Sequence, residues 1–272
     1  MKIGIFDSGV GGLGVYSRMR QYSQAKGLPV DLLYLGDTLR APYGEKSIDL
    51  VSHYGGLGLS ALKSMGAQSI VLACNTAYVA LAQIGDPIIR SCNLVHPISF
   101  AVNEIVALSV RRVLVLSTQI TADSKMYTRS IQELNPEIEV VERACSGLVR
   151  LIERGEFAGM AVRAEVLASI AGYQLNDFDA IILGCTHFSL VASTIEDLVG
   201  SSVRVVDGVV GMIKQIFSQI HTSDQKSFVT RSRLFITGDS NQFGTIANRL
   251  FGIDPNSIEQ LILDDTLCAA EC

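Results

Sequence analysis

Short runs of Val, Ile and Leu recur along the chain, and each is followed by a Gly- or Ser-marked turn and a longer stretch of mixed polarity. This alternation is typical of buried parallel strands joined by helices, because a strand covered on both faces is apolar throughout. The pattern predicts a compact α/β fold. The expected strands are residues 2–6, 30–35, 69–73, 112–116, 138–141, 180–183 and 203–206, with 234–236 as a late strand.

The expected strands form an approximate internal repeat. Any two buried strands look somewhat alike, but three pairs in the same order at nearly constant offsets of 108 to 111 residues favour two similar halves. The three pairs are KIGIFDS at 2–8 with RVLVLST at 112–118, DLLYLGDT at 31–38 with EVVERACS at 139–146, and SIVLACNT at 69–76 with AIILGCTH at 180–187.

Two cysteines occupy matching positions in this repeat, since Cys74 and Cys185 each lie within two residues of the end of an expected strand. Ligands of parallel sheets bind outside the carboxyl ends of the strands, so residues at these ends are candidate site residues. If two sheets face each other across a cleft, the two thiols lie on opposite sides of a ligand. The other residues at strand ends are Asp7, Ser8, Gly36, Asp37, Asn75, Thr76, Ser117, Thr118, Thr186 and His187.

A pair of facing thiols suits the inversion of a carbon centre. A free cysteine has a pKa of about 8.5, and the N-terminus of a following helix is expected to lower it, so that thiol and thiolate both serve near neutral pH. One sulfur then removes the α-proton from one face, and the other returns a proton to the opposite face of the planar intermediate. This arrangement predicts a two-base racemase.

The neighbouring side chains suit an amino acid as the ligand. Helix N-termini hold a carboxylate, and neutralising that carboxylate makes the α-proton more acidic. Asp7 and His187 are titratable groups near the thiols, where they can tune a thiol or hold the ammonium group. The uncharged hydrogen-bonding groups at the strand ends are Asn75, Thr76, Thr118 and Thr186.

Two other functions fit parts of the same pattern. Gly9, Gly11 and Gly14 spell GxGxxG after the first strand, and Asp37 follows at a spacing close to that of a dinucleotide-binding fold. A dehydrogenase, however, has no use for two mirrored thiols, and Asp7 stands where a pyrophosphate would approach. A cysteine nucleophile with histidine, as in an amidohydrolase, would use residues 185 and 187 and leave the other thiol idle.

Charge and hydropathy exclude several classes of partner. The formal net charge is −5 and no block of Lys or Arg is present, so we expect neither nucleic-acid nor anionic-membrane binding. The uncharged segment between Lys63 and Asp86 is interrupted by polar residues, and a strand followed by a helix fits it better than a membrane span. Residues 3–6 are far too short for a signal-peptide core, so we expect a cytoplasmic protein.

The remaining cysteines and histidines carry no motif. Six cysteines without close-spaced pairs in a cytosolic chain indicate free thiols, and no CxxC is present to hold zinc, so we expect no metal site. We expect the other cysteines to be small buried residues and the other histidines to be surface or structural residues. These are Cys92, Cys145, Cys268, Cys272, His53, His96 and His221.

Four ordered motifs resemble the glutamate racemases: DSGVGGL at 7–13, GDT followed by PYG at 36–44, ACNTA at 73–77 and GCTH at 184–187. STQIT at 117–121 and CSGLVRLIE at 145–153 add to the resemblance. It implies two α/β domains with the active site between them, no cofactor, and interconversion of L- and D-glutamate to supply D-glutamate for peptidoglycan. A racemase of a related acidic amino acid such as aspartate is the alternative.

The resemblance also implies roles for single residues. Cys74 resembles the base for D-glutamate and Cys185 the base for L-glutamate, with Asp7 and His187 as their respective helpers. Asp37 and Glu153 match acidic positions that lie near the site in the family. The implied substrate-binding residues are Asp7, Ser8, Tyr43, Gly44, Asn75, Thr76, Thr118, Thr186 and His187.

The resemblance divides the chain into two domains. The first takes residues 1–95 and 207–272, and the second takes 96–206. It also implies a homodimer acting on a small-molecule substrate. The sequence departs from the usual family pattern at Ser117, at residues 96–98 and at 188–189, and none of these departures removes an expected catalytic group.

Overall fold

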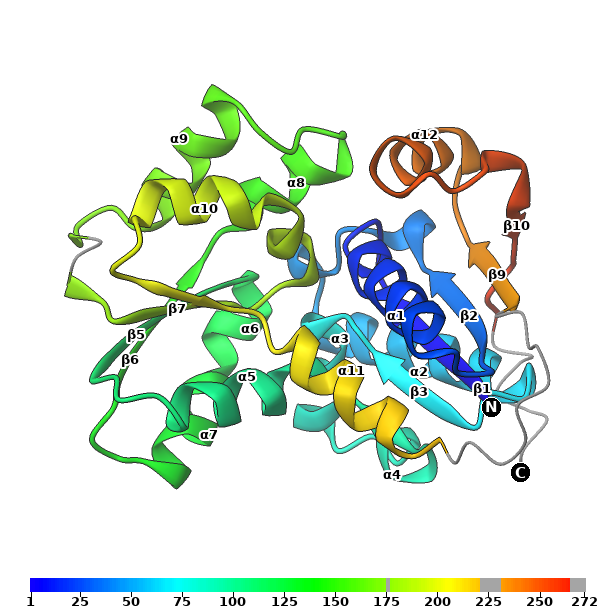
Figure 1. The fold of residues 1–272 in the computed structure, drawn as a ribbon, viewed down its shortest axis with the longest axis horizontal. Coiled ribbons are helices and arrows are strands. Elements are labelled where there is room, and N and C mark those ends of the chain that lie inside the picture. Colours follow the sequence, from blue (N-terminus) through cyan, green and yellow to red (C-terminus); the bar gives the residue numbers. More distant parts are fainter. Residues whose placement is uncertain (175–176, 221–230, 265–272) are drawn as a thin grey trace.

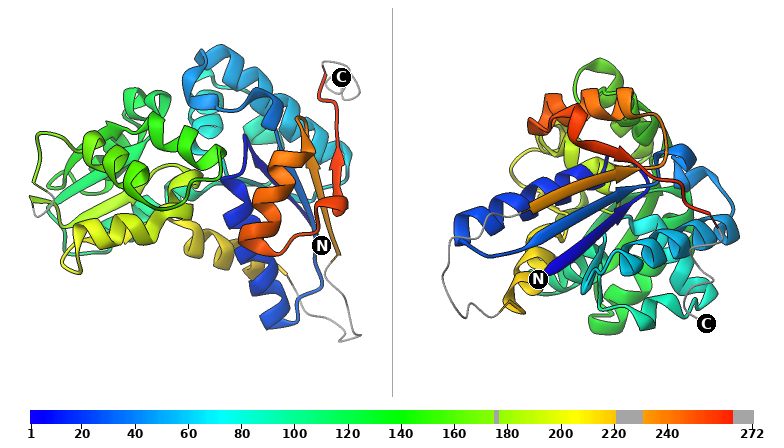
Figure 2. Two further views of the ribbon diagram at one scale, coloured as in Figure 1. Left: turned by 90° about the horizontal axis from the view of Figure 1, so that it is seen from above. Right: turned by 90° about the vertical axis from the view of Figure 1, so that its right-hand side faces the viewer.

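The computed structural model describes residues 1–174, 177–220 and 231–264, and its strands form two separate sheets. One sheet has six strands and the other has four, and every strand pair in the described residues is parallel. The two sheets lie in two lobes, at the right and the left of Figure 1, and the view from above in Figure 2 separates them in the same way. The α/β class with two parallel sheets flanked by helices is therefore confirmed.

The first lobe contains the six-stranded sheet, with strand order β10-β9-β2-β1-β3-β4. Its strands are β1 (Lys2–Asp7), β2 (Asp31–Gly36), β3 (Ser69–Leu72), β4 (Leu94–Val95), β9 (Arg231–Ile236) and β10 (Ile258–Gln260). Its helices are α1 (Gly12–Lys26), α2 (Ile48–Ser64), α3 (Asn75–Ile84), α4 (Ile88–Ser91) and α12 (Ser240–Phe251), with the short 3-10 helices η1 (Thr38–Arg40), η2 (Tyr43–Glu45) and η5 (Pro255–Ser257).

The second lobe contains the four-stranded sheet, with strand order β6-β5-β7-β8. Its strands are β5 (Arg112–Ser117), β6 (Glu139–Ala144), β7 (Ala180–Leu183) and β8 (Arg204–Val206). Its helices are α6 (Gln119–Ser124), α7 (Met126–Leu134), α8 (Ser146–Glu153), α9 (Met160–Ser169), the 3-10 helix η4 (Thr186–Val191) and α10 (Ala192–Val199). Two further helices, α5 (Pro97–Val106) and α11 (Val209–Ser218), pack against each other near the junction of the lobes.

The two sheets confirm the internal repeat. In the first lobe the order β2-β1-β3-β4 places the first strand between the second and third, and in the second lobe β6-β5-β7-β8 repeats this order. The three pairs of similar segments thus occupy equivalent places in the two sheets. The exact division of the chain at residues 95 and 207 stays a prediction.

Most expected strands are confirmed, with boundaries that differ by a few residues. Two strands were missed: β4 has only two residues, and β10 has only three, of which Glu259 and Gln260 are exposed. The expected strand at 138–141 is longer and ends at Ala144, because β6 lies at a sheet edge and tolerates charged residues there. The uncharged segment after Lys63 forms β3 and α3, as expected, and no helix in the described part of the chain is long and apolar enough to cross a membrane.

The central strands are buried on both faces, which explains their continuous apolar character. On β1, Ile3 and Ile5 pack into a core with α1 and α12, while Phe6 packs on the other face with α2 and α3. The first of these cores also takes in Leu114 of β5 and Phe188 of η4, so it extends through both lobes. A shared core of this kind fixes the carboxyl ends of β1, β3, β5 and β7 close to one another.

Candidate active site

The structure places the two cysteines at equivalent strand ends. Cys74 follows β3 and is the N-cap of α3, and Cys185 follows β7 and is the N-cap of the 3-10 helix η4. Both are buried, with exposed fractions of 4% and 6%, and they are close enough for the charge of Cys185 to contribute to the raised pKa of Cys74. The geometry thus brings the two thiols to one junction between the lobes.

Direct hydrogen bonds join the lobes around the thiols. Thr186 Oγ1 of the second lobe donates to Asp7 Oδ2 of the first at 3.0 Å, and the hydroxyl groups of Thr76 and Thr118 lie 2.9 Å apart. Gly44 lies so close to the second lobe that a Cβ atom on it would stand 2.7 Å from Cβ of Thr118. The residues predicted from the strand ends therefore meet at one place.

Cys74 lies among groups that favour its thiol form. Its Sγ donates a hydrogen bond to Ser8 Oγ at 3.6 Å. Burial, followed by the negative charge of Asp7, raises the pKa of Cys74 to about 12, and a hydrogen bond from the Ala77 backbone does not offset this. The expectation that the helix N-terminus lowers the thiol pKa is wrong for Cys74, because desolvation outweighs the helix dipole.

Cys185 lies beside a charged histidine. Its Sγ is 3.6 Å from His187 Nδ1, and His187 Nε2 is 2.6 Å from Glu153 Oε1. Burial opposes the positive charge of His187, but the hydrogen bonds and the charges of Cys185 and Glu153 outweigh it and raise the pKa of His187 well above its usual value. A positive imidazole thus stands between a carboxylate and a sulfur.

Asp7 lies on the first-lobe side of the junction, at the end of β1. It is fully buried and accepts hydrogen bonds from the backbone of Gly9 at 3.0 Å and from Thr186. Burial raises its pKa, against the lowering effects of the His187 charge and these hydrogen bonds. Asp7 acts on Cys74 through its charge, whereas the sulfur itself bonds to Ser8.

Tyr43 forms part of the wall beside Cys74. The side chain is 1% exposed, and its hydroxyl donates to Asp37 Oδ2 at 2.6 Å. Burial and the Asp37 carboxylate raise the pKa of Tyr43 well above its usual value, so the phenol keeps its proton. The hydroxyl of Tyr43 is thus bonded to the protein, and its ring packs in the same core as Cys74.

Asn75 presents a polar atom that has no partner. Its Nδ2 donates to Tyr127 Oη at 3.5 Å, whereas its Oδ1 is buried without a hydrogen bond. A buried acceptor of this kind is costly unless a ligand satisfies it. Sequence reasoning missed Tyr127, which lies in a helix and carries no motif.

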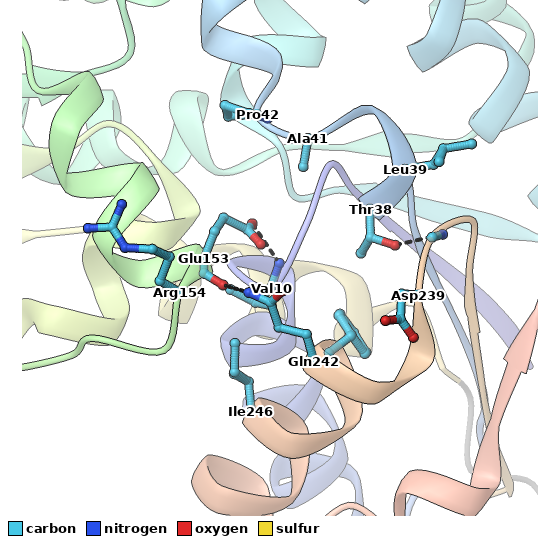
Figure 3. Close-up of a pocket in the computed structure, with 12 residues that line it drawn as sticks. Val10, Thr38, Leu39, Ala41, Pro42, Glu153, Arg154, Asp239, Gln242 and Ile246 are labelled. Atoms are coloured by element: carbon cyan, nitrogen blue, oxygen red, sulfur yellow. Dashed lines mark hydrogen bonds between the residues drawn. The ribbon is translucent and has the colours of Figure 1, made fainter.

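Almost the whole site is closed off from solvent. Apart from Gly44, each implied catalytic or substrate-binding residue has an exposed fraction of 6% or less. A cavity of about 340 Å³ lies beside the site, between α8, α12 and the loop before η2, and Val10, Glu153 and Gln242 line it (Figure 3). Neither thiol lines this cavity, but Glu153, which does, contacts His187 beside Cys185.

The glycine motif serves the contact between the lobes. A Cβ atom on Gly11 would lie 2.5 Å from Thr186 Oγ1 and 2.6 Å from His187 Nδ1, so only glycine fits there. The second lobe occupies the space in which a pyrophosphate would have to lie. Asp37, which the dinucleotide hypothesis needs for a ribose, is fully buried and already hydrogen-bonded within the protein.

The residues set aside as structural lie away from the thiols or pack in the protein. Cys145 is buried, and Ser169 donates to its sulfur at 2.6 Å. His96 stacks on Tyr78 with ring centroids 3.5 Å apart. Residues 221, 268 and 272 lie outside the described residues. No group of three or more His, Cys, Asp or Glu in residues 1–174, 177–220 and 231–264 is arranged to hold a metal ion.

A two-lobed parallel α/β fold with one thiol at each of two equivalent strand ends has the architecture of an amino-acid racemase. The family model for Asp/Glu/Hydantoin racemase matches residues 3–216. The chain therefore belongs to the Asp/Glu/Hydantoin racemase family, and it is an isomerase.

Individual relatives cover almost the whole chain. The glutamate racemase of Shouchella clausii is 32% identical and covers 97% of this chain and 95% of its own length. Glutamate racemase 2 of Caldanaerobacter subterraneus is 30% identical, with coverage of 92% and 93%.

Solved structures agree with the observed fold. Glutamate racemase from Francisella tularensis, in complex with D-glutamate, has a TM-score of 0.84 at 26% identity and covers 97% of this chain and 98% of that one. An aspartate racemase from Picrophilus torridus has a TM-score of 0.60 at 18% identity, with coverage of 80% and 93%, and this likeness concerns the fold alone.

Proposed function

We propose that this protein is a cofactor-independent glutamate racemase that uses Cys74 and Cys185 as its two acid–base groups. The observation that carries the proposal is the pair of buried thiols at equivalent strand ends of two lobes, with hydrogen bonds between the lobes around them. The names of the relatives that match most of the chain support glutamate as the substrate.

In this mechanism the Cys185 thiolate takes the α-proton of L-glutamate, and the electron pair of the broken C–H bond moves into the α-carboxylate to give a planar carbanion. The Cys74 thiol then donates its proton to the opposite face, which gives D-glutamate. After the turnover Cys74 is a thiolate and Cys185 a thiol. The reverse reaction starts from that state. Release of a proton from Cys185 to solvent and uptake of one by Cys74 restore the starting state.

The electrostatics of the site support this assignment. The pKa of Cys74, raised to about 12, keeps that sulfur protonated and ready to donate. The positive charge on His187 lies 3.6 Å from the Cys185 sulfur, where a proton acceptor is needed. The resting enzyme is thus prepared for L-glutamate.

The surrounding polar groups suit an amino acid with two carboxylates. We assign the unpartnered Oδ1 of Asn75 to the substrate ammonium group, because it is a buried acceptor. The hydroxyls of Thr76, Thr118 and Thr186 suit the α-carboxylate, together with the N-terminus of α3.

Substrate entry requires the lobes to separate. Both thiols are buried, and the backbone at Gly44 and Gly11 lies so close to side chains of the second lobe that an added Cβ atom would not fit. Closing the lobes over the ligand would expel water, which strengthens the interactions that hold the carbanion.

The decisive experiment is racemisation in deuterated water. Starting from L-glutamate, the first D-glutamate formed should carry deuterium at Cα while the remaining L-glutamate keeps its hydrogen, because different sulfurs serve the two faces. Equal early labelling of substrate and product would contradict the two-base mechanism. Substitution of either Cys74 or Cys185 by Ala should nearly abolish racemisation.

Two further assays test substrate and cofactor independence. A kcat/KM for aspartate comparable to that for glutamate would favour the alternative substrate. If the thiols supply both proton transfers, activity on glutamate should survive exhaustive dialysis and treatment with a chelator. Activity that returns only on adding pyridoxal phosphate, nicotinamide or a metal ion would contradict the proposal.

The proposed biological role is the supply of D-glutamate for peptidoglycan, by a cytoplasmic homodimer. The support is the resemblance of the motifs at 7–13, 73–77 and 184–187 to glutamate racemases. Depletion of the protein in its host should cause a D-glutamate requirement for growth, and light scattering of the pure protein measures its oligomeric state.

A further inference from the structure

Asp37 is a fully buried carboxylate that the mechanism does not use. It lies directly after β2, and its two oxygens accept three side-chain hydrogen bonds. Oδ1 accepts from Thr237 Oγ1 at 2.7 Å and from Arg40 Nη1 at 2.9 Å, and Oδ2 accepts from the Tyr43 hydroxyl at 2.6 Å. Asp37 thus connects the end of β9 with the segment that contains Tyr43.

The loop from Asp37 to Gly44 depends on these bonds for its position. Thr38 and Pro42 of this loop line the 340 Å³ cavity, so neighbouring side chains do not support it on that side (Figure 3). The end of β9 adds two bonds: the Thr237 hydroxyl accepts from the backbone of Leu39 at 3.0 Å, and Thr38 Oγ1 accepts from the backbone of residue 238 at 2.9 Å. Hydrogen bonds therefore hold the loop where packing is missing.

The far end of the loop forms one wall of the site. Tyr43 packs in the same core as Cys74, and its hydroxyl lies in the electrostatic field of that cysteine. Gly44 abuts Thr118 of the other lobe. Because the Tyr43 hydroxyl is committed to Asp37, the tyrosine offers a ligand only its ring and its backbone.

We propose that Asp37, held by Thr237, is a positioning residue that sets how far the Tyr43–Gly44 wall of the site lies from the thiols, and so determines how well the site fits glutamate rather than the shorter aspartate. This inference rests on the proposed function. Asp37 does not touch the reacting atoms, since its oxygens are taken by three protein donors. Its effect passes through Tyr43.

A positioning role and a merely structural role predict different kinetics. If the loop is displaced, the Tyr43–Gly44 wall no longer fits the substrate, so KM for glutamate rises while proton transfer at the thiols continues. If Asp37 only stabilises the fold, its loss lowers the amount of active enzyme, which reduces apparent kcat and leaves KM unchanged.

The test compares Asp37→Asn, Thr237→Val and Thr237→Ser with the wild type. Asp37→Asn should raise KM for both glutamate enantiomers about tenfold, with kcat within about twofold, because a hydrogen bond to a charged group is lost. The ratio of kcat/KM for glutamate to that for aspartate should fall by a similar factor. Thr237→Val should give a smaller shift in the same direction, and Thr237→Ser, which keeps the hydroxyl, should restore wild-type KM.

Asp179→Asn is the matched control. Asp179 also orders backbone, accepting from the N–H groups of Arg111 and Arg112 at 2.7 and 2.9 Å, but it lies before β7 at the opposite end of that strand from Cys185. Its substitution should lower the melting temperature and leave KM unchanged.

Two outcomes would overturn the two claims separately. A wild-type enzyme that does not racemise glutamate would overturn the proposed function. Wild-type racemisation of glutamate combined with unchanged KM and unchanged selectivity in Thr237→Val and Asp37→Asn would overturn the positioning role alone. If Asp37→Asn does not fold, the comparison of KM and selectivity between Thr237→Val and Thr237→Ser tests the positioning role.

Discussion

Thr186, the residue next to one thiol, donates a 3.0 Å hydrogen bond to Asp7, the carboxylate whose charge acts on the other thiol. The two residues belong to different lobes and are separated by 179 positions in the chain. This bond therefore joins the two lobes and links the residue beside Cys185 to the carboxylate that acts on Cys74.

Loss of the Thr186 hydroxyl should weaken catalysis. In Thr186→Val the buried Asp7 carboxylate loses one of its donors, which costs roughly 1.5–3 kcal/mol for a bond to a charged group. We expect kcat/KM to fall by about ten- to a hundredfold for both glutamate enantiomers. Thr186→Ser keeps the donor and should stay close to wild type, and equal kinetics for Val and Ser would contradict this role.

Substitution of Gly11 should block closure of the lobes. Its backbone conformation is one that alanine adopts readily, so the effect in Gly11→Ala comes from the added Cβ, which would lie 2.5 Å from Thr186 Oγ1. We expect activity to fall by about two orders of magnitude, because small displacements of reacting groups are costly. Gly14→Ala in the same motif is the control: its Cβ meets only the Leu190 side chain at 3.3 Å, and kinetic assays should find nearly wild-type activity.

Glu153 should control the charge of His187. In the wild type the Val10 backbone N–H donates to Glu153 Oε1 at 3.1 Å, and Glu153→Gln keeps an oxygen that can accept this bond. The substitution removes the negative charge beside the imidazole. The pKa of His187 should fall, so the high-pH loss of activity should begin at a lower pH. The pH dependence of kcat/KM and an NMR titration of the imidazole measure this shift. Glu156→Gln, which alters an exposed pair with Arg154, should leave the profile unchanged.

His96 should make the protein less stable in acid. Burial lowers its pKa to about 4, its Nδ1 has no partner, and its ring stacks on Tyr78. The unfolded chain binds a proton at this histidine near pH 6.5 and the folded chain only near 4. The contribution of neutral His96 to the free energy of unfolding is therefore fully present above pH 6.5. As the pH falls from 6.5 toward 4, the free energy of unfolding decreases by about 1.4 kcal/mol per pH unit.

The measurement for His96 is urea unfolding at pH 7 and at pH 5. His96→Phe keeps an aromatic ring on Tyr78 and should lose less of its free energy of unfolding between these pH values than the wild type does. His53→Asn changes an exposed histidine and should behave as the wild type. An identical acid sensitivity in all three proteins would show that His96 is not the responsible group.

The rule that polar residues follow strands at a site predicts most of the side chains that meet between the lobes, and it extends to one more residue. The run at 234–236 is predicted to be a strand, and Thr237 follows it directly, so the same rule applies to this residue. The structure places its hydroxyl 2.7 Å from Asp37. Tyr127 gave no such signal, because its contact with Asn75 depends on how α7 packs against α3.

The sequence by itself determined the α/β class, the two repeated halves and the residues at the strand ends, because apolar periodicity and the succession of strands along the chain are local properties. Only the tertiary structure decided how these residues are charged and connected. Burial raises the pKa of Cys74 where its helix position alone would lower it, and the positive charge of His187 depends on Glu153, 34 positions away in the chain. Desolvation and contacts between lobes arise only in the folded chain, since both depend on which distant residues exclude water from a group.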